Sequence, residues 1–176
     1  MKKVICLLLM TAVLCGFAMG ETALPELDLF AYEFGVSEET VIAGSGEPAG
    51  EDTRTNKMGI TRHFLNYDVQ SFSQKWNLSY LFVDGRLLEV DALLDLEQAD
   101  AALDPTEMYN QVCGFMTEKM GDPTSVSGPE KIKDGPYAGG QEYVTQYSKD
   151  KVSGICFVVE KDSKILLLQF YTYLNE

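Results

Sequence analysis

The side chains that most often carry catalysis are scarce in this sequence. It contains one histidine, His63, and four cysteines, against 27 acidic residues. His63 stands between an arginine and a phenylalanine, with no second histidine to share a metal and no serine or cysteine motif to form a triad. We therefore expect a surface or strand-edge histidine, no cofactor, no metal site and no catalytic residue. A hydrolase built on two carboxylates remains an alternative, because so many acids always yield some pair.

Two further patterns resemble binding motifs without completing them. The glycine-rich stretch 135–140 lacks the lysine and the following serine or threonine of a phosphate-binding loop, which indicates a flexible loop. An acidic series lacks the spacing and central glycine of a calcium loop; it comprises Asp84, Glu89, Asp91, Asp95, Glu97, Asp100 and Asp104. We interpret it as a solvated acidic face, with weak calcium binding or a basic partner as the alternatives.

The overall charge narrows the class of partner. The chain of 176 residues has a formal net charge of -13, and 45% of its residues are apolar, as in ordinary globular proteins. A phosphate backbone or an anionic lipid surface would repel such a chain, so we expect no nucleic acid partner. The acidic charge favours a protein partner that is basic or carries a basic patch.

The first twenty residues have the pattern of a signal peptide. Lys2 and Lys3 precede the apolar run 4–13, and Ala18 and Gly20 are the small residues of a cleavage site. We predict cleavage near Gly20 and a secreted or cell-envelope location, with no integral membrane segment in the mature chain.

Two other fates of this segment are disfavoured by its sequence. A permanent membrane anchor is disfavoured because the apolar stretch is shorter than the roughly 20 residues of a spanning helix. Lipid anchoring at Cys15 is disfavoured because the bulky Leu14 precedes it.

Cleavage would leave Cys113 and Cys156 together in an oxidising compartment, where a disulfide is permitted. Against a disulfide, Cys113 lies at the edge of a helical apolar stripe, and Cys156 alternates along a strand. The two side chains could therefore point to different sides and remain separately buried thiols.

Capping signals predict two helices. Ser37 followed by two glutamates begins a short helix that ends over 44–48. Asp104, with Pro105 and Glu107, begins a longer helix that runs to residue 120. An apolar stripe with spacings of four predicts its buried face; the stripe comprises Met108, Val112, Met116 and Met120.

Three extended segments follow each helix. In the first half they span about 60–67, 75–83 and 86–94, with an Asp-Gly hairpin turn at 84–85. In the second half they span about 141–147, 151–159 and 164–173. The stretches 49–59 and 126–140, rich in glycine, proline, serine and charge, are predicted as loops that carry binding.

The two halves share a sequence offset. Gly46-Glu47-Pro48 recurs as Gly121-Asp122-Pro123, and Leu81-Phe82-Val83 recurs as Cys156-Phe157-Val158, both 75 residues later. We predict a signal peptide over 1–20, a loose leader over 21–29, a first repeat over 30–94, a connector over 95–103 and a second repeat over 104–176.

This pattern resembles the β-lactamase inhibitor protein fold, of which the small outer-membrane-assembly lipoproteins contain a single unit. Phe34-Gly35-Val36-Ser37-Glu38-Glu39-Thr40-Val41, the two Gly-x-Pro motifs and the hairpin ending at Gly85 carry the resemblance. It implies an α+β fold, in which a tandem repeat of a helix plus three antiparallel strands forms one curved sheet with helices on one face. The chain lacks the family's cysteine pair in each half, so inhibition of a β-lactamase is not implied.

In such a fold the concave face of the sheet is open to a protein partner. Strand alternation would place Leu166, Leu168, Phe170 and Leu174 on the helix side, and Ile165, Leu167, Tyr171 and Tyr173 on the open side. Tyr143 and Tyr147 have equal parity on a neighbouring segment, and tyrosines are enriched at interface centres. The alternatives are a second face covered by loops or a dimer mate, or inverted parity.

We therefore predict an exported, non-enzymatic protein-binding module of unknown oligomeric state. A binder of a small ligand or glycan in the envelope is the alternative, with Trp76 and the tyrosines stacking on sugars.

Overall fold

The computed structural model describes residues 25–100 and 103–175. The predicted signal peptide, its cleavage site near Gly20 and the lipidation alternative at Cys15 lie outside the described residues. No helix within the described ranges is long and apolar enough to cross a membrane.

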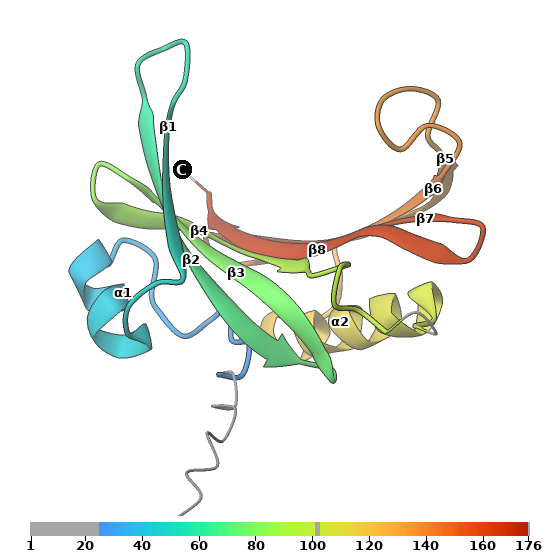
Figure 1. Cartoon of the computed structure of the whole chain (residues 1–176), viewed down its shortest axis with the longest axis horizontal. Coiled ribbons are helices and arrows are strands. Elements are labelled where there is room, and N and C mark those ends of the chain that lie inside the picture. The colour runs from blue at the N-terminus through green and yellow to red at the C-terminus, as the bar shows by residue number, and fades with distance from the viewer. Residues whose placement is uncertain (1–24, 101–102, 176) are drawn as a thin grey trace, which may run out of the picture.

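The described chain forms one open antiparallel sheet of eight strands with two helices (Figure 1). Helix α1 (Glu38–Ser45) precedes four strands, which are β1 (Gly50–Thr55), β2 (Thr61–Ser71), β3 (Gln74–Val83) and β4 (Arg86–Leu94). Helix α2 (Pro105–Met120) precedes four more, β5 (Ser125–Lys131), β6 (Gln141–Lys149), β7 (Val152–Lys161) and β8 (Lys164–Leu174). The strand order β1-β2-β3-β4-β8-β7-β6-β5 puts β4 and β8 side by side in the middle.

Each helix is therefore followed by four strands, not by three. The stretches 49–59 and 126–140, predicted as loops, contain the edge strands β1 and β5. Almost every residue of these two strands is exposed, so no apolar alternation marks them in the sequence. Each pairs with only one neighbour, which leaves its other hydrogen-bonding edge open.

The capping signals locate the helices well. The Asp104 side chain accepts a hydrogen bond of 2.8 Å from the Glu107 backbone N–H, and α2 begins at Pro105 as predicted. The predicted methionine and valine stripe of α2 is fully buried against the sheet. Helix α1 begins after Ser37, but the Ser37 hydroxyl contacts Thr40 Oγ1 rather than a backbone N–H.

The sheet is curved, and both helices lie on its convex side (Figure 1). The core fills the space between them, where Trp76, Phe82 and Phe170 are its largest fully buried side chains. Residues 25–29, predicted as part of a loose leader, are anchored instead. Leu27 and Leu29 are buried in this core, and the Leu27 N–H donates to the Gln70 carbonyl oxygen.

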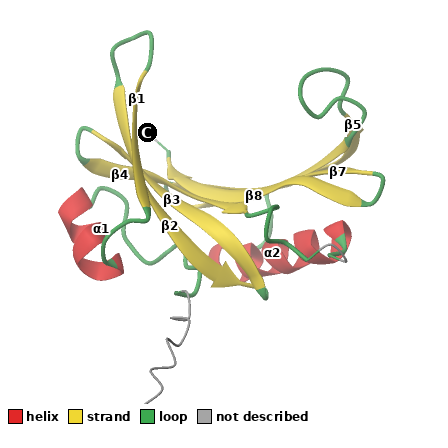
Figure 2. Ribbon diagram, in the orientation of Figure 1, coloured by secondary structure: helices red, strands yellow, loops and turns green. Residues whose placement is uncertain are grey.

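Two loops rise on the concave side of the sheet (Figure 2). Residues 56–60 join β1 to β2 at one end of the sheet, and residues 132–140 join β5 to β6 at the other end. The concave face lies between these two loops, and neither of the two described helices covers it.

Candidate functional site

The concave face carries an unusual group of side chains at its centre. Glu89 and Asp91 lie on β4, and their partners across the ladder to β8 are Tyr173 and Tyr171. All four side chains are half-buried. We call this group the central patch. The two tyrosine rings lie 6.0 Å apart between centroids and are tilted by 30°.

Strand parity explains why these residues share one face. Val90 and Ala92 on β4, and Phe170 and Thr172 on β8, are buried toward the helices. The residues between them must point to the opposite face, because side chains alternate along a strand.

The carboxylates of the central patch are poorly solvated. Burial raises the pKa of Asp91 to about 6, against the lowering effect of a hydrogen bond from Gln169 and with a further increase from Glu89. Gln169 Nε2 donates to Asp91 Oδ2 at 2.9 Å, whereas Oδ1 is buried and has no hydrogen-bond partner among the described residues. Burial also raises the pKa of Glu89, opposed by Arg62. The centre of the face is thus an acceptor site without enough donors.

This finding corrects the interpretation of the acidic series as a solvated face for two of its members, Glu89 and Asp91; Asp84, Glu97, Asp100 and Asp104 are exposed as predicted. Glu89 and Asp91 occur in the sequence Leu88-Glu89-Val90-Asp91-Ala92, where they alternate with apolar residues. That alternation places them inside a sheet and next to apolar neighbours, and it is the signal that could have separated them from the other acids.

The structure divides the five residues predicted for partner binding between the two faces. Tyr171 and Tyr173 lie on the concave face, as predicted. Trp76 is completely buried under the sheet and donates its indole N–H to the Ser71 carbonyl oxygen. It therefore cannot contact a partner or stack on a sugar.

Tyr143 and Tyr147 also face the helices. Tyr147 is only 2% exposed, and its hydroxyl donates to the Cys113 carbonyl oxygen at 2.9 Å. Tyr143 packs against the Tyr109 ring, with centroids 6.0 Å apart. Their parity was wrong because Tyr143 pairs with Val158, and Tyr147 with Gly154, both of which face the core.

Two residues on β8 also change sides: Ile165, predicted on the open side, and Leu166, predicted on the helix side. The register between β7 and β8 shifts between Val159 and Glu160, so Ile165 packs against the core. Leu166 and Leu167 instead line a hollow of about 410 Å³ on the concave side, together with Leu93 and Tyr137. The bulge thus adds apolar surface to the open face near the 132–140 loop.

His63 has a structural role on the convex side. Its Nδ1 lies 2.8 Å from Glu38 Oε2 at the start of α1, and its Nε2 lies 3.6 Å from Glu51 Oε2. The histidine thus links β2 to α1 and β1. Within the described residues, no group of three or more histidine, cysteine or acidic side chains is placed to hold a metal ion.

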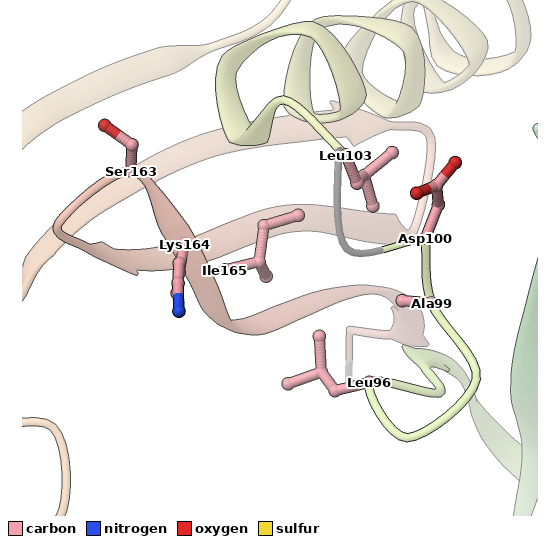
Figure 3. A pocket seen from close by; sticks show the side chains of 7 residues that line it. All are labelled: Leu96, Ala99, Asp100, Leu103, Ser163, Lys164 and Ile165. Atoms are coloured by element: carbon pink, nitrogen blue, oxygen red, sulfur yellow. The ribbon is translucent and has the colours of Figure 1, made fainter.

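A pocket of about 260 Å³ lies away from the central patch, between residues 96–100 and 103 on one side and the turn joining β7 to β8 on the other (Figure 3). Four apolar side chains line it, together with Asp100, Ser163 and Lys164. It brings together none of the residues predicted for binding.

Comparison with known proteins does not identify a family for this chain. No protein-family model, no curated protein and no solved structure matches this chain. The resemblance to the β-lactamase inhibitor protein fold therefore stays a prediction.

Proposed function

We propose that this chain is an exported, non-enzymatic protein-binding module that holds a cationic segment of a partner protein on its concave face. The central patch is the observation that carries the proposal. Its tyrosines offer large contact area with polar tips, and its carboxylates offer negative charge that the protein itself leaves incompletely paired.

The energetics favour a cationic occupant. Burying a carboxylate without sufficient donors costs free energy in the free protein, and the raised pKa of Asp91 reports that cost. A lysine ammonium or an arginine guanidinium between Asp91 and the ring of Tyr171 would supply both the missing donors and a cation–π contact. The net charge of -13 would also accelerate the encounter with a basic partner.

The two loops would contact the flanks of the same partner. Met58 is 80% exposed and Ile60 is 41% exposed at the end of the loop joining β1 to β2. On the opposite side, Tyr137 of the 132–140 loop lines the apolar hollow with Leu93. Exposed apolar side chains on both sides of a charged centre suit a protruding segment that is apolar around one cationic side chain.

We also propose that the two halves arose by duplication and form an inhibitor-like tandem fold. The offset of 75 residues fits the helix ends, Ser45 and Met120, and the starts of β1 and β5. In the hairpins the offset is 78 residues, as between Gln74 and Val152. The matched triplets at 81–83 and 156–158 are therefore not equivalent positions, because a shift of 75 puts Phe82 in the core and Phe157 on the concave face.

A glycan-binding function has less support. Its main aromatic candidate, Trp76, is buried in the core, which leaves only the tyrosines of the concave face for stacking. A thermal shift with a panel of cell-wall fragments and other glycans would favour this alternative if any of them stabilises the protein and the partner search below fails.

The proposal is tested by comparative capture from the secreted and envelope fractions of the producing cells, at low and high salt. The baits are the wild type, a Tyr171→Ala/Tyr173→Ala variant, an Asp91→Asn variant and the control Val126→Ala, which removes an exposed apolar side chain from the convex side. We expect one protein to be recovered by the wild type and by the control. The tyrosine variant should lose it, and Asp91→Asn should recover less of it.

Either of two results would contradict the proposal. One is that no protein exceeds background on the wild type at either salt concentration. The other is equal recovery by the wild type and the tyrosine variant, provided that circular dichroism shows both to be folded. If the Asp91→Asn variant recovers as much of the partner as the wild type does, while the tyrosine variant loses it, the cationic contact is removed from the proposal and the tyrosine surface is kept.

A further inference from the structure

Two cysteines meet between α2 and the sheet. Cys113 lies in the middle of α2 and is half-buried, whereas Cys156 lies on β7 and is fully buried. Both are free thiols, and each is the main influence on the pKa of the other, which places the two side chains next to each other. The expectation that they point to different sides was wrong.

Hydrogen bonds on both sides of the pair hold this approach in place. One turn before Cys113, the Tyr109 hydroxyl lies 2.7 Å from Thr145 Oγ1, and Thr145 is the partner of Cys156 across the β6–β7 ladder. The Tyr147 hydroxyl donates to the Cys113 carbonyl oxygen at 2.9 Å. Packing of α2 against β6 and β7 therefore brings the two sulfur atoms together independently of any bond between them.

The two thiols differ in reactivity. The hydrogen bond with Cys156 lowers the pKa of Cys113 to about 7, against the opposing effect of burial, and the Thr145 hydroxyl lowers it further. The hydrogen bond with Cys113 and burial raise the pKa of Cys156. Cys113 is thus both the first to lose its proton and the more accessible sulfur, which makes it the attacking group.

We propose that Cys113 and Cys156 form an intramolecular disulfide that fastens α2 to β7 when the protein meets a low-molecular-weight disulfide such as oxidised glutathione. The Cys113 thiolate attacks one sulfur of this oxidant, so that a mixed disulfide forms and one small thiolate leaves with the electron pair. The Cys156 sulfur, giving up its proton, then attacks the Cys113 sulfur and displaces the second small thiolate. The two protein protons end on the two small thiols, and one small disulfide is reduced for each protein disulfide formed.

This cross-link lies on the convex side and does not depend on the proposed partner-binding function. It would join the helix to the sheet beneath the central patch, between residues separated by 43 positions in the chain. Closing such a loop restricts the unfolded chain and so stabilises the folded one.

The test uses the purified full chain, reduced and then incubated with oxidised glutathione under native conditions. Peptide mapping after alkylation of remaining thiols is expected to show the peptides of Cys113 and Cys156 joined, with no glutathione retained on either. The urea concentration at the unfolding midpoint should rise on oxidation and return on reduction. The Cys156→Ser variant is the matched control: its Cys113 should capture one glutathione and keep it, because no second thiol displaces it.

Two results would overturn the proposal. One is that, after the folded wild type has been incubated with oxidised glutathione and then denatured, both thiols are still alkylated. The other is that Cys113 of the wild type keeps its glutathione, as it does in the control. Because the mapping is performed on the wild type, the conclusion stands even where a variant fails to fold.

Discussion

On the convex face of the sheet Tyr147 is buried and donates its hydroxyl to the backbone of α2, whereas on the concave face Tyr171 and Tyr173 lie half-buried beside two carboxylates. The residue type is the same, but the surroundings differ. Beneath the sheet the tyrosine and tryptophan polar tips named above are hydrogen-bonded within the protein, the Thr172 hydroxyl is buried without a partner among the described residues, and apolar volume is filled by methionine and aromatic side chains. Above it, charge is buried without full pairing. The convex face is built for stability and the concave face carries a cost in stability.

The largest expected effect comes from the core. Trp76→Ala should lower the free energy of unfolding by about 3–5 kcal/mol, because it leaves a cavity against Phe170, whose ring centroid lies 5.1 Å from that of Trp76. Urea unfolding monitored by circular dichroism measures the loss. Asn77→Ala, the exposed neighbour on the concave face, is the control and should change stability by less than about 1 kcal/mol. Equal effects would mean that the two faces are not energetically distinct.

The next effect has the opposite sign. Asp91→Asn should stabilise the free protein at pH 7 by up to about 3 kcal/mol, since a pKa displaced from 3.8 to about 6 corresponds to that cost for the ionised form. The folded state holds this proton longer than the unfolded state. The wild type should therefore lose stability as the pH rises from about 4 to about 6, and the variant should lose less over the same interval.

Chemical denaturation of both proteins at intervals across that range checks the sign. Glu97→Gln, an exposed acid on the connector, serves as the charge-matched control and should leave the slope unchanged. A variant that is less stable than the wild type at pH 7 would show that Asp91 is a structural group rather than a strained one.

A smaller effect is expected where α2 crosses β7. A methyl group on Gly154 would come within 2.5 Å of Met116 Cε and Met120 Sδ. Gly154→Ala should cost about 1 kcal/mol, at the lower end of overpacking effects, because the ends of methionine side chains can move aside. The change is read from the unfolding midpoint, with Ser153→Ala on the other face as the control. A stabilised variant would indicate that α2 is loosely packed there.

The smallest effect concerns the tyrosines of the central patch. Tyr173→Ala should change the free energy of unfolding by no more than about 1 kcal/mol, because a half-buried side chain on an open face leaves no closed cavity. Differential scanning calorimetry measures the change. A loss as large as that of Trp76→Ala would place Tyr173 in the core and remove it from the proposed interface.

The same contrast between the two faces explains which parts of the fold could be predicted from the sequence. The inner strands were predictable because their apolar residues alternate; β4 has the predicted bounds, 86–94. The edge strand Gly50–Thr55 was not, because its composition is that of a loop and only the pairing with β2 makes it extended. Pairing of this kind is a tertiary effect that local propensity does not encode.

The face of a strand was harder to predict than its existence. Alternation separates two sets of side chains but does not say which set meets the helices. For β8 the assignment of Phe170 and Tyr171 was correct, whereas for β6 that of Tyr147 was inverted. Ile165 lies on the other face than predicted because of a β-bulge, and no residue type in the sequence indicates that bulge. The central patch needs two strands that are far apart in sequence, so a single-strand pattern reveals only half of it.

The seam between β4 and β8 is short: five residue pairs join these strands, half as many as the ten that join β2 to β3. Within the described part of the chain, it is the only ladder that joins the first four strands to the last four. Under mechanical load the sheet would divide along this line, which runs between Asp91 and Tyr171. A partner that contacts both residues would therefore hold the two halves of the sheet together. Hydrogen exchange along β4 and β8 would then slow when the partner binds.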